Sequence, residues 1–150
     1  MLVYRISRSK WANDLSGEGA RLYGGRWNNK GVACLYTSSS ISLAILEFSV
    51  NVSLDQIPRS LSLVTLKIPD EVYVLKIEDL PGDWNSVPAP SSTKDFGSGL
   101  LTEGRHLTIK IPSSVISRES NFIINPLHPQ IKQCKIVSVE DFVFDVRIKD

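Results

Sequence analysis

The sequence contains few cysteines and few histidines, two of each in 150 residues. Cys34 and Cys134 each lie within an apolar run, and neither has a second cysteine or a histidine at the spacing of a metal site. His106 and His128 are too isolated in the sequence to suggest a metal centre. We therefore expect two buried thiols, without a disulfide and without a metal.

Long hydrophobic runs and a large excess of one charge are also absent. The residues are 42% hydrophobic and 22% charged, which is typical of a globular protein, and no apolar stretch has the length needed to span a bilayer. Met1 leads straight into a strand-like segment rather than a basic, hydrophobic leader, so we expect a cytoplasmic protein. A net charge of +1 provides no basic footprint for nucleic acid.

The charges are nevertheless unevenly distributed along the chain. Residues 1–50 carry six basic and three acidic side chains, whereas residues 51–150 carry eleven basic and thirteen acidic ones. The first third of the chain is therefore where an anion would bind, although an imbalance of this size also arises by chance on a solvated surface.

The length and the pattern of apolar residues predict a single α+β domain over residues 1–150. A helix is predicted over 41–50 after three serines that can cap it, and loops are predicted over the glycine-rich residues 11–25 and the polar residues 81–99. Strands are predicted at 2–6, 32–37, 61–68, 72–77, 107–111, 122–125, 135–139 and 142–148. Because strands and helices do not alternate, we expect an antiparallel or mixed sheet with few helices.

Three charged residues stand at unusual places. Arg26 follows two glycines, where the backbone can approach a ligand closely, and its guanidinium matches a phosphate or pyrophosphate; a surface arginine in a glycine turn has the same pattern. Arg5 lies in the middle of a strand, where a long cation faces either solvent or a polar cleft. Glu47 is the only acid between residues 19 and 54, at the edge of the predicted apolar helix face, so it faces either a cleft or solvent.

Three further residues are candidates for binding a ligand. Tyr36 ends the strand before the predicted helix, where its ring either stacks on a planar ligand or packs in the core. Ser113 follows one predicted strand and Asn121 directly precedes another, and both positions are also ordinary strand ends. The sequence has no Walker-type loop, no Rossmann glycine spacing and no evident Ser-His-acid triad.

Taken in order, these residues resemble the RES domain, the toxin of RES/Xre type II toxin–antitoxin pairs. The resemblance covers nearly the whole chain. It is carried by Tyr4-Arg5, Gly24-Gly25-Arg26-Trp27-Asn28, Gly31, Tyr36, Ser38, Ser42-Leu43-Ala44-Ile45-Leu46-Glu47, Pro112-Ser113, Asn121 and Asn125-Pro126-Leu127-His128-Pro129.

The resemblance implies a fold similar to the ADP-ribosyltransferase toxins and a pocket that takes NAD⁺ as its substrate. Members of the family degrade NAD⁺ by hydrolysis or phosphorolysis, and some transfer ADP-ribose to a protein. The expected partner is a helix-turn-helix antitoxin. Self-association into a homodimer is also compatible with the sequence, although no residue requires it. A catalytically silent binding module remains the alternative from another functional class.

The same resemblance implies a role for each candidate residue. Glu47 is expected at the ribose and the developing cation, and Tyr36 at the nicotinamide. Arg5 and Arg26 are expected at the pyrophosphate or at an incoming phosphate. Supporting polar contacts are assigned to Ser113 and Asn121.

Overall fold

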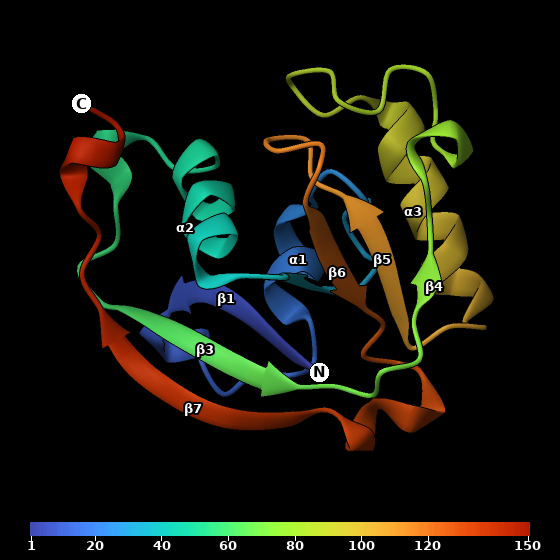
Figure 1. The fold of residues 1–150 in the computed structure, drawn as a ribbon, viewed down its shortest axis with the longest axis horizontal. Helices are drawn as coiled ribbons and strands as arrows, with labels where there is room; N and C mark the ends of the chain where they lie inside the picture. The colour runs from blue at the N-terminus through green and yellow to red at the C-terminus, as the bar shows by residue number, and fades with distance from the viewer.

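In the computed structural model, which describes residues 1–150, seven strands form one sheet in the order β4-β5-β6-β2-β1-β3-β7 (Figure 1). The strands are β1 (Leu2–Arg8), β2 (Leu35–Ser38), β3 (Leu61–Lys67), β4 (Tyr73–Val74), β5 (Thr108–Pro112), β6 (Ser120–Ile124) and β7 (Lys135–Phe142). The α-helices are α1 (Glu18–Tyr23), α2 (Ile41–Val50) and α3 (Ser91–Glu103). Short 3-10 turns are η1 (Ser9–Trp11), η2 (Leu54–Gln56), η3 (Ile77–Asp79), η4 (Pro129–Gln133) and η5 (Val146–Ile148). All neighbouring strands are antiparallel except β4 and β5, which confirms the predicted α+β class with a mixed sheet.

The sheet divides into two parts where β1 meets β2. A single residue pair, Tyr4 with Ser38, joins these two strands, whereas β1 pairs with β3 over its full seven residues. Figure 1 shows β1, β3 and β7 running across the lower part of the molecule, with α2 above them, while β5 and β6 stand steeply beside α3. Apart from the Tyr4–Ser38 pair, β1 and β2 are not paired, so this pair is the one link between the two parts of the sheet.

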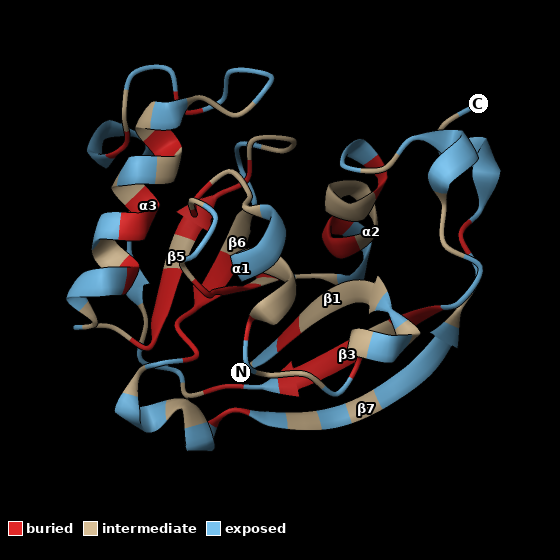
Figure 2. Cartoon of the chain, turned by 180° about the vertical axis from the view of Figure 1, so that it is seen from behind, coloured by how far each residue is buried: buried red, intermediate tan, exposed pale blue.

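Two apolar clusters stabilise the sheet, and β2 contributes to both. Because successive side chains of a strand point to opposite faces, Leu35 belongs to one cluster and its neighbours Cys34 and Tyr36 to the other. The first cluster includes Val3, Val64, Leu66, Phe122 and Ile124, and the second, next to α3, includes Trp27, Trp84, Leu101, Ile109 and Ile111. Figure 2 shows that β3 and β5 are largely buried and that the edge strand β7 is mostly exposed or half-buried. None of the three helices has the length and apolar character that a bilayer crossing requires.

The helix α2 begins and ends as predicted, at Ile41 and Val50. Ser40 caps it, because its Oγ accepts the N–H of Leu43 at 3.1 Å. The prediction of buried thiols is also confirmed, since Cys34 and Cys134 are both buried and free.

The predicted loop over residues 11–25 is wrong, because it contains the helix α1. Glycines frame this helix instead of preventing it. Gly17 (φ 71°) and Gly24 (φ 72°) have the positive φ angles that other residues avoid, and they let the chain turn sharply into and out of six helical residues.

The predicted loop over residues 81–99 is also wrong beyond Pro90, where α3 begins. Its sequence, with two glycines and several hydroxyl side chains, has low helix propensity. The helix is explained by a tertiary contact: a Cβ built on Gly97 would lie only 2.0 Å from the carbonyl oxygen of Trp27. Glycine at this position therefore permits α3 to pack directly against the Trp27 backbone.

Three strand predictions, those at 72–77, 135–139 and 142–148, are wrong in extent. The strand predicted at 72–77 shortens to β4, because the chain turns into η3, where the Asp79 carboxylate accepts the N–H of Lys76 at 2.8 Å. The strands predicted at 135–139 and 142–148 are the single strand β7, followed by η5, where the Asp145 carboxylate accepts the N–H of Arg147 at 3.0 Å. In both places a local carboxylate cap ends the extended backbone.

We expect Gly97→Ala and Gly99→Ala to change stability in opposite directions. The added methyl at position 97 meets the Trp27 backbone, which should lower the free energy of unfolding by about 1–3 kcal/mol. The methyl at position 99 meets nothing within 4 Å. Because alanine stabilises a helix interior more than glycine does, Gly99→Ala should raise the free energy of unfolding by about 0.5–1 kcal/mol. Urea unfolding of both variants measures the difference. Equal stability of the two would contradict the close contact between α3 and Trp27.

Candidate active site

Glu47 lies on α2, three and four residues after the buried Ala44 and Leu43. Residues three and four apart share one face of a helix, so the Glu47 side chain is directed toward the sheet and is half-buried. The helix thus carries a carboxylate to the junction of the two parts of the sheet, in line with its predicted place at the edge of the apolar face.

Two side chains from the other part of the sheet meet this carboxylate. Ser113, which follows β5, donates its hydroxyl hydrogen to Glu47 Oε1 at 2.6 Å, and Asn121 on β6 donates from Nδ2 to the same oxygen at 2.6 Å. Ser113 Oγ itself accepts the N–H groups of Val115 and Ile116 at 3.0 and 3.1 Å. A hydroxyl has one hydrogen, so these two acceptor contacts leave that hydrogen for Glu47.

The two oxygens of Glu47 are therefore in different situations. Oε1 accepts two short hydrogen bonds, whereas Oε2 accepts none from the protein. A carboxylate held through one oxygen keeps its orientation while the other oxygen stays available to a substrate. A fixed negative charge of this kind can stabilise a positive charge that develops beside it.

Arg26 lies in the glycine turn that precedes β2. Its Nη1 donates to the carbonyl oxygens of Trp84 and Ser86 at 3.0 and 2.8 Å. Burial lowers the pKa of Arg26, and the negative charge of Glu47 acts in the opposite direction, so the two side chains are near enough to influence each other. Because Nη1 is bound to carbonyls, Nε and Nη2 remain available to bind an anion.

The hydroxyl of Tyr36 is fixed by two neighbours. It donates to Asn28 Oδ1 at 2.6 Å and accepts the N–H of Trp27 at 3.0 Å. Asn28 is itself fully buried, and its Nδ2 donates to the carbonyls of Ala20 and Val32, each at 2.8 Å. Burial, the largest cause, raises the pKa of Tyr36 well above its ordinary value, so the residue is neutral. The ring, rather than the hydroxyl, is the part of Tyr36 that remains for a ligand.

We expect Tyr36→Phe to lower the free energy of unfolding by about 1–3 kcal/mol, because it leaves Asn28 Oδ1 and the Trp27 N–H buried without partners. Chemical denaturation measures this loss. Tyr23→Phe is the matched control, because Tyr23 is 76% exposed and its variant should unfold like the wild type. A Tyr36→Phe protein as stable as the control would show that the hydroxyl does not hold the glycine turn.

Arg5 binds the chain segment that follows η1. Its Nη2 donates to the carbonyl oxygens of Trp11, Ala12 and Asp14 at 3.3, 3.0 and 2.7 Å. Burial lowers the pKa of Arg5, and the Asp14 carboxylate acts in the opposite direction. None of these hydrogen bonds reaches Glu47, so Arg5 holds a wall of the site rather than the carboxylate.

Arg5 and Tyr36 line the same cavity, of about 270 Å³, which is bordered by β1, β2 and α1. Its walls also include Arg8, Trp11 and Tyr23. The cavity is therefore cationic and aromatic, and it lies where β1 and β2 are not paired. Of the six candidate residues, Arg5 and Tyr36 line this cavity, whereas Glu47, Ser113 and Asn121 meet at the Glu47 carboxylate.

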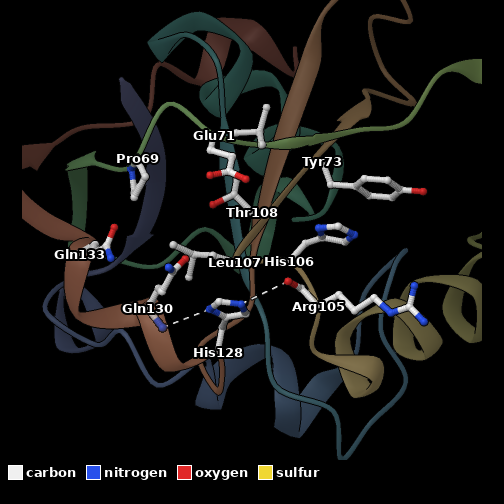
Figure 3. Close-up of a pocket in the computed structure, with 11 residues that line it drawn as sticks. Pro69, Glu71, Tyr73, Arg105, His106, Leu107, Thr108, His128, Gln130 and Gln133 are labelled. Carbon is white, nitrogen blue, oxygen red and sulfur yellow. Dashed lines mark hydrogen bonds between the residues drawn. The ribbon is translucent and has the colours of Figure 1, made fainter.

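A separate cavity, of about 230 Å³, lies at the other end of β5 (Figure 3). It is lined by residues around β4, the start of β5 and η4, with the rings of Tyr73 and His106 stacked 4.1 Å apart. Figure 3 shows His128, on the cavity wall, accepting the N–H of Gln130. None of the six candidate residues borders this cavity. Thr108, on its wall, is five residues from Ser113, about 16 Å along an extended strand. This cavity is not part of the candidate site.

Several groups that build the site could not be predicted from the sequence. The carbonyl oxygens of Trp84 and Ser86 hold Arg26, and Asn28 holds Tyr36. Backbone acceptors carry no signal in a sequence. One feature of the sequence could have pointed to Asn28: it ends the Gly-Gly-Arg-Trp-Asn turn, where a buried amide can form hydrogen bonds with several backbone groups at once.

Known proteins resemble this chain in sequence and in fold. The Toxin Res of Yersinia enterocolitica is 37% identical over 153 residues, covering 99% of this chain and 100% of the relative. The Prs ADP-ribosylating toxin of a Sphingobium species is 38% identical over 146 residues, covering 95% of this chain and 91% of the relative. A chain in the crystal structure of the M. tuberculosis MbcT–MbcA toxin–antitoxin complex has the same fold, with a TM-score of 0.74 and 18% identity over 99% of this chain and 87% of that chain.

The family model described as RES domain matches residues 2–145, which include β1 to β7 and all six candidate residues. With this match and with relatives at 37% and 38% identity over nearly the full chain, the protein belongs to the RES domain family.

Proposed function

We propose that this protein is the toxin of a bacterial toxin–antitoxin pair and that it consumes NAD⁺ by cleaving the bond between nicotinamide and ribose. The observation that carries the proposal is Glu47, held through Oε1 by Ser113 and Asn121, with Oε2 free and with Arg26 nearby. Support also comes from the relatives, which are named Toxin Res and Prs ADP-ribosylating toxin.

The proposed reaction needs a negative charge at the ribose. As the bond breaks, nicotinamide leaves with the bonding electron pair, and the ribose becomes a cation that resembles an oxocarbenium ion. Glu47 Oε2 stabilises that cation. Water then adds to the anomeric carbon and releases one proton, so the products are nicotinamide, ADP-ribose and a proton. With inorganic phosphate as acceptor, the products are nicotinamide and ADP-ribose carrying a phosphate on the anomeric carbon.

The pyrophosphate of the substrate is negatively charged, and we assign two arginines of the proposed site to its binding. Arg26 presents Nε and Nη2, since its Nη1 is bound to backbone carbonyls. Arg5 lines the cavity together with the ring of Tyr36, to which we assign the nicotinamide side. Ser113 and Asn121 act on the substrate through Glu47, as their hydrogen bonds suggest.

A second candidate reaction uses the same site. If the acceptor is a side chain of another protein, the reaction is ADP-ribosylation, as the name of the Sphingobium relative states for that protein. The two reactions share the cleavage step and differ in what attacks the ribose. A catalytically silent binding module is the alternative that predicts no cleavage at all.

A toxin of this kind needs a partner that keeps it inactive. The structural relative was crystallised as a toxin–antitoxin complex, which supports a protein antitoxin for this chain. We propose a helix-turn-helix protein encoded beside it, as the family resemblance implies. NAD⁺ is the substrate, and the proposal requires no metal, membrane or nucleic acid.

Expression in bacteria tests the proposal. Induction of the wild-type chain should arrest growth and lower total cellular NAD⁺, and co-expression of the neighbouring antitoxin should relieve both effects. Arrest with unchanged NAD⁺ would favour ADP-ribosylation of a cellular protein. A soluble, folded wild-type chain that causes no arrest would overturn the proposal in favour of a binding module.

A further inference from the structure

A buried serine lies behind the side chains that hold Glu47. Ser38 is the last residue of β2, and it is paired with Tyr4 of β1 on one side and with Asn121 of β6 on the other. Its exposed fraction is only 3%. Because strands on both sides fix its backbone, Ser38 offers its hydroxyl at a well-defined place, at the one point where β1 and β2 are joined.

The Ser38 hydroxyl determines which way the Asn121 amide faces. Ser38 Oγ donates to Asn121 Oδ1 at 2.8 Å, and Asn121 Nδ2 donates to Glu47 Oε1 at 2.6 Å. A side-chain amide has an acceptor on one side and donors on the other, so an oxygen held by Ser38 leaves the nitrogen facing Glu47. If the amide turned over, its oxygen would face a carboxylate oxygen, and two acceptors without a hydrogen repel each other.

The second donor to Glu47 is oriented independently of Ser38. Ser113 is held by the N–H groups of Val115 and Ile116, in the connection between β5 and β6. Removal of the Ser38 hydroxyl therefore disturbs only one of the two hydrogen bonds on Oε1. The Glu47 carboxylate would remain in place but would be free to rotate about the remaining bond.

We propose that Ser38 is a positioning residue of the active site, which acts through Asn121 to keep Glu47 Oε2 directed at the ribose. The inference rests on the proposed function, in which Glu47 stabilises the cation formed there. Ser38 contacts no substrate. Ser38 therefore helps to stabilise the transition state, and its loss should lower kcat. The binding of NAD⁺ depends on other groups, so KM should change little.

The first test compares serine variants in a nicotinamide-release assay. Ser38→Ala should lower kcat by about tenfold and change KM by less than about twofold, since one buried hydrogen bond on the catalytic carboxylate is lost. Ser38→Thr keeps the hydroxyl and should recover most of the rate. The matched control is Ser39→Ala, an exposed neighbour whose variant should behave like the wild type. A raised KM with unchanged kcat would overturn the proposal.

A double-mutant cycle separates a role through Asn121 from a general loss of stability. In an Asn121→Ala background, adding Ser38→Ala should cost no further activity, because the amide that Ser38 orients is already absent. If the two substitutions instead lower kcat multiplicatively, Ser38 does not act through Asn121, and the inference is wrong.

A measurement without substrate keeps this inference distinct from the proposed function. If the wild-type chain releases no nicotinamide, the proposed function fails, while the side-chain amide resonances of Asn121 in the NMR spectrum still report its orientation. Ser38→Ala should shift these resonances and speed their hydrogen exchange, whereas Ser39→Ala should leave them unchanged. Asn121 resonances that are the same in Ser38→Ala and wild type would overturn the inference.

Discussion

Replacing Glu47 with alanine is expected to lower kcat for NAD⁺ cleavage by about a thousandfold, the effect of losing a preorganised charge at the transition state. The carboxylate faces the junction of the two parts of the sheet and accepts two hydrogen bonds through one oxygen. Its removal leaves no large cavity in the core, because the side chain is only half-buried. The variant should therefore stay folded, with its KM for NAD⁺ close to that of the wild type.

Two variants make this prediction specific to the charge. Glu47→Gln keeps the shape of the side chain and loses the negative charge, so it should be nearly as inactive as Glu47→Ala. Glu140→Ala removes an exposed acid on β7, outside the site, and should have no effect. Nicotinamide release by the purified variants, with circular dichroism to verify folding, gives the comparison. A folded Glu47→Ala protein with near-wild-type turnover would contradict the assignment.

Replacing Arg26 is the second change with a large expected effect. Arg26→Ala removes a cation from the site and also releases the segment around Trp84 and Ser86, so kcat/KM should fall by about a hundredfold or more. Most of that loss should appear as a raised KM, because an arginine that binds the pyrophosphate acts on the ground state as well as the transition state. Steady-state kinetics over a range of NAD⁺ concentrations separates the two constants.

A lysine at position 26 tests the geometry of the guanidinium. Arg26 uses Nη1 for two carbonyls and keeps Nε and Nη2 for an anion, whereas one ammonium group cannot occupy both places. Arg26→Lys should therefore recover less than about a tenth of the lost kcat/KM. Arg118→Ala, at an exposed position, is the control for a general effect of positive charge. Full recovery by lysine would show that charge alone matters there.

The fold was predictable where local pattern and tertiary structure agree. The helix α2 follows from an apolar repeat and the Ser40 cap, and most strands follow from their β-branched residues. The helix α3 was not predictable in this way, because its glycine at position 97 is needed for contact with Trp27, a residue far away in the sequence. The same glycine lowers helix propensity, so local pattern predicts the wrong structure there.

The site was predictable as a set of residue types but not as a geometry. The resemblance includes Glu47, Ser113 and Asn121, and the structure shows that they meet at one carboxylate oxygen. The resemblance does not reveal that Arg5 is bound mainly to backbone carbonyls. It also does not reveal that Ser38 lies behind Asn121, because a cross-strand pair depends on the register of the sheet.

The central claim, that this site cleaves NAD⁺, is tested most directly by incubating the purified chain with NAD⁺ and measuring free nicotinamide. Parallel reactions in water alone, with inorganic phosphate, and with a bacterial extract as a source of protein acceptors identify the acceptor. We expect nicotinamide release by the wild type without any protein acceptor, and none by Glu47→Ala. Release only with the extract would move the assignment to protein ADP-ribosylation. A folded wild-type chain that releases no nicotinamide under all three conditions would contradict the claim.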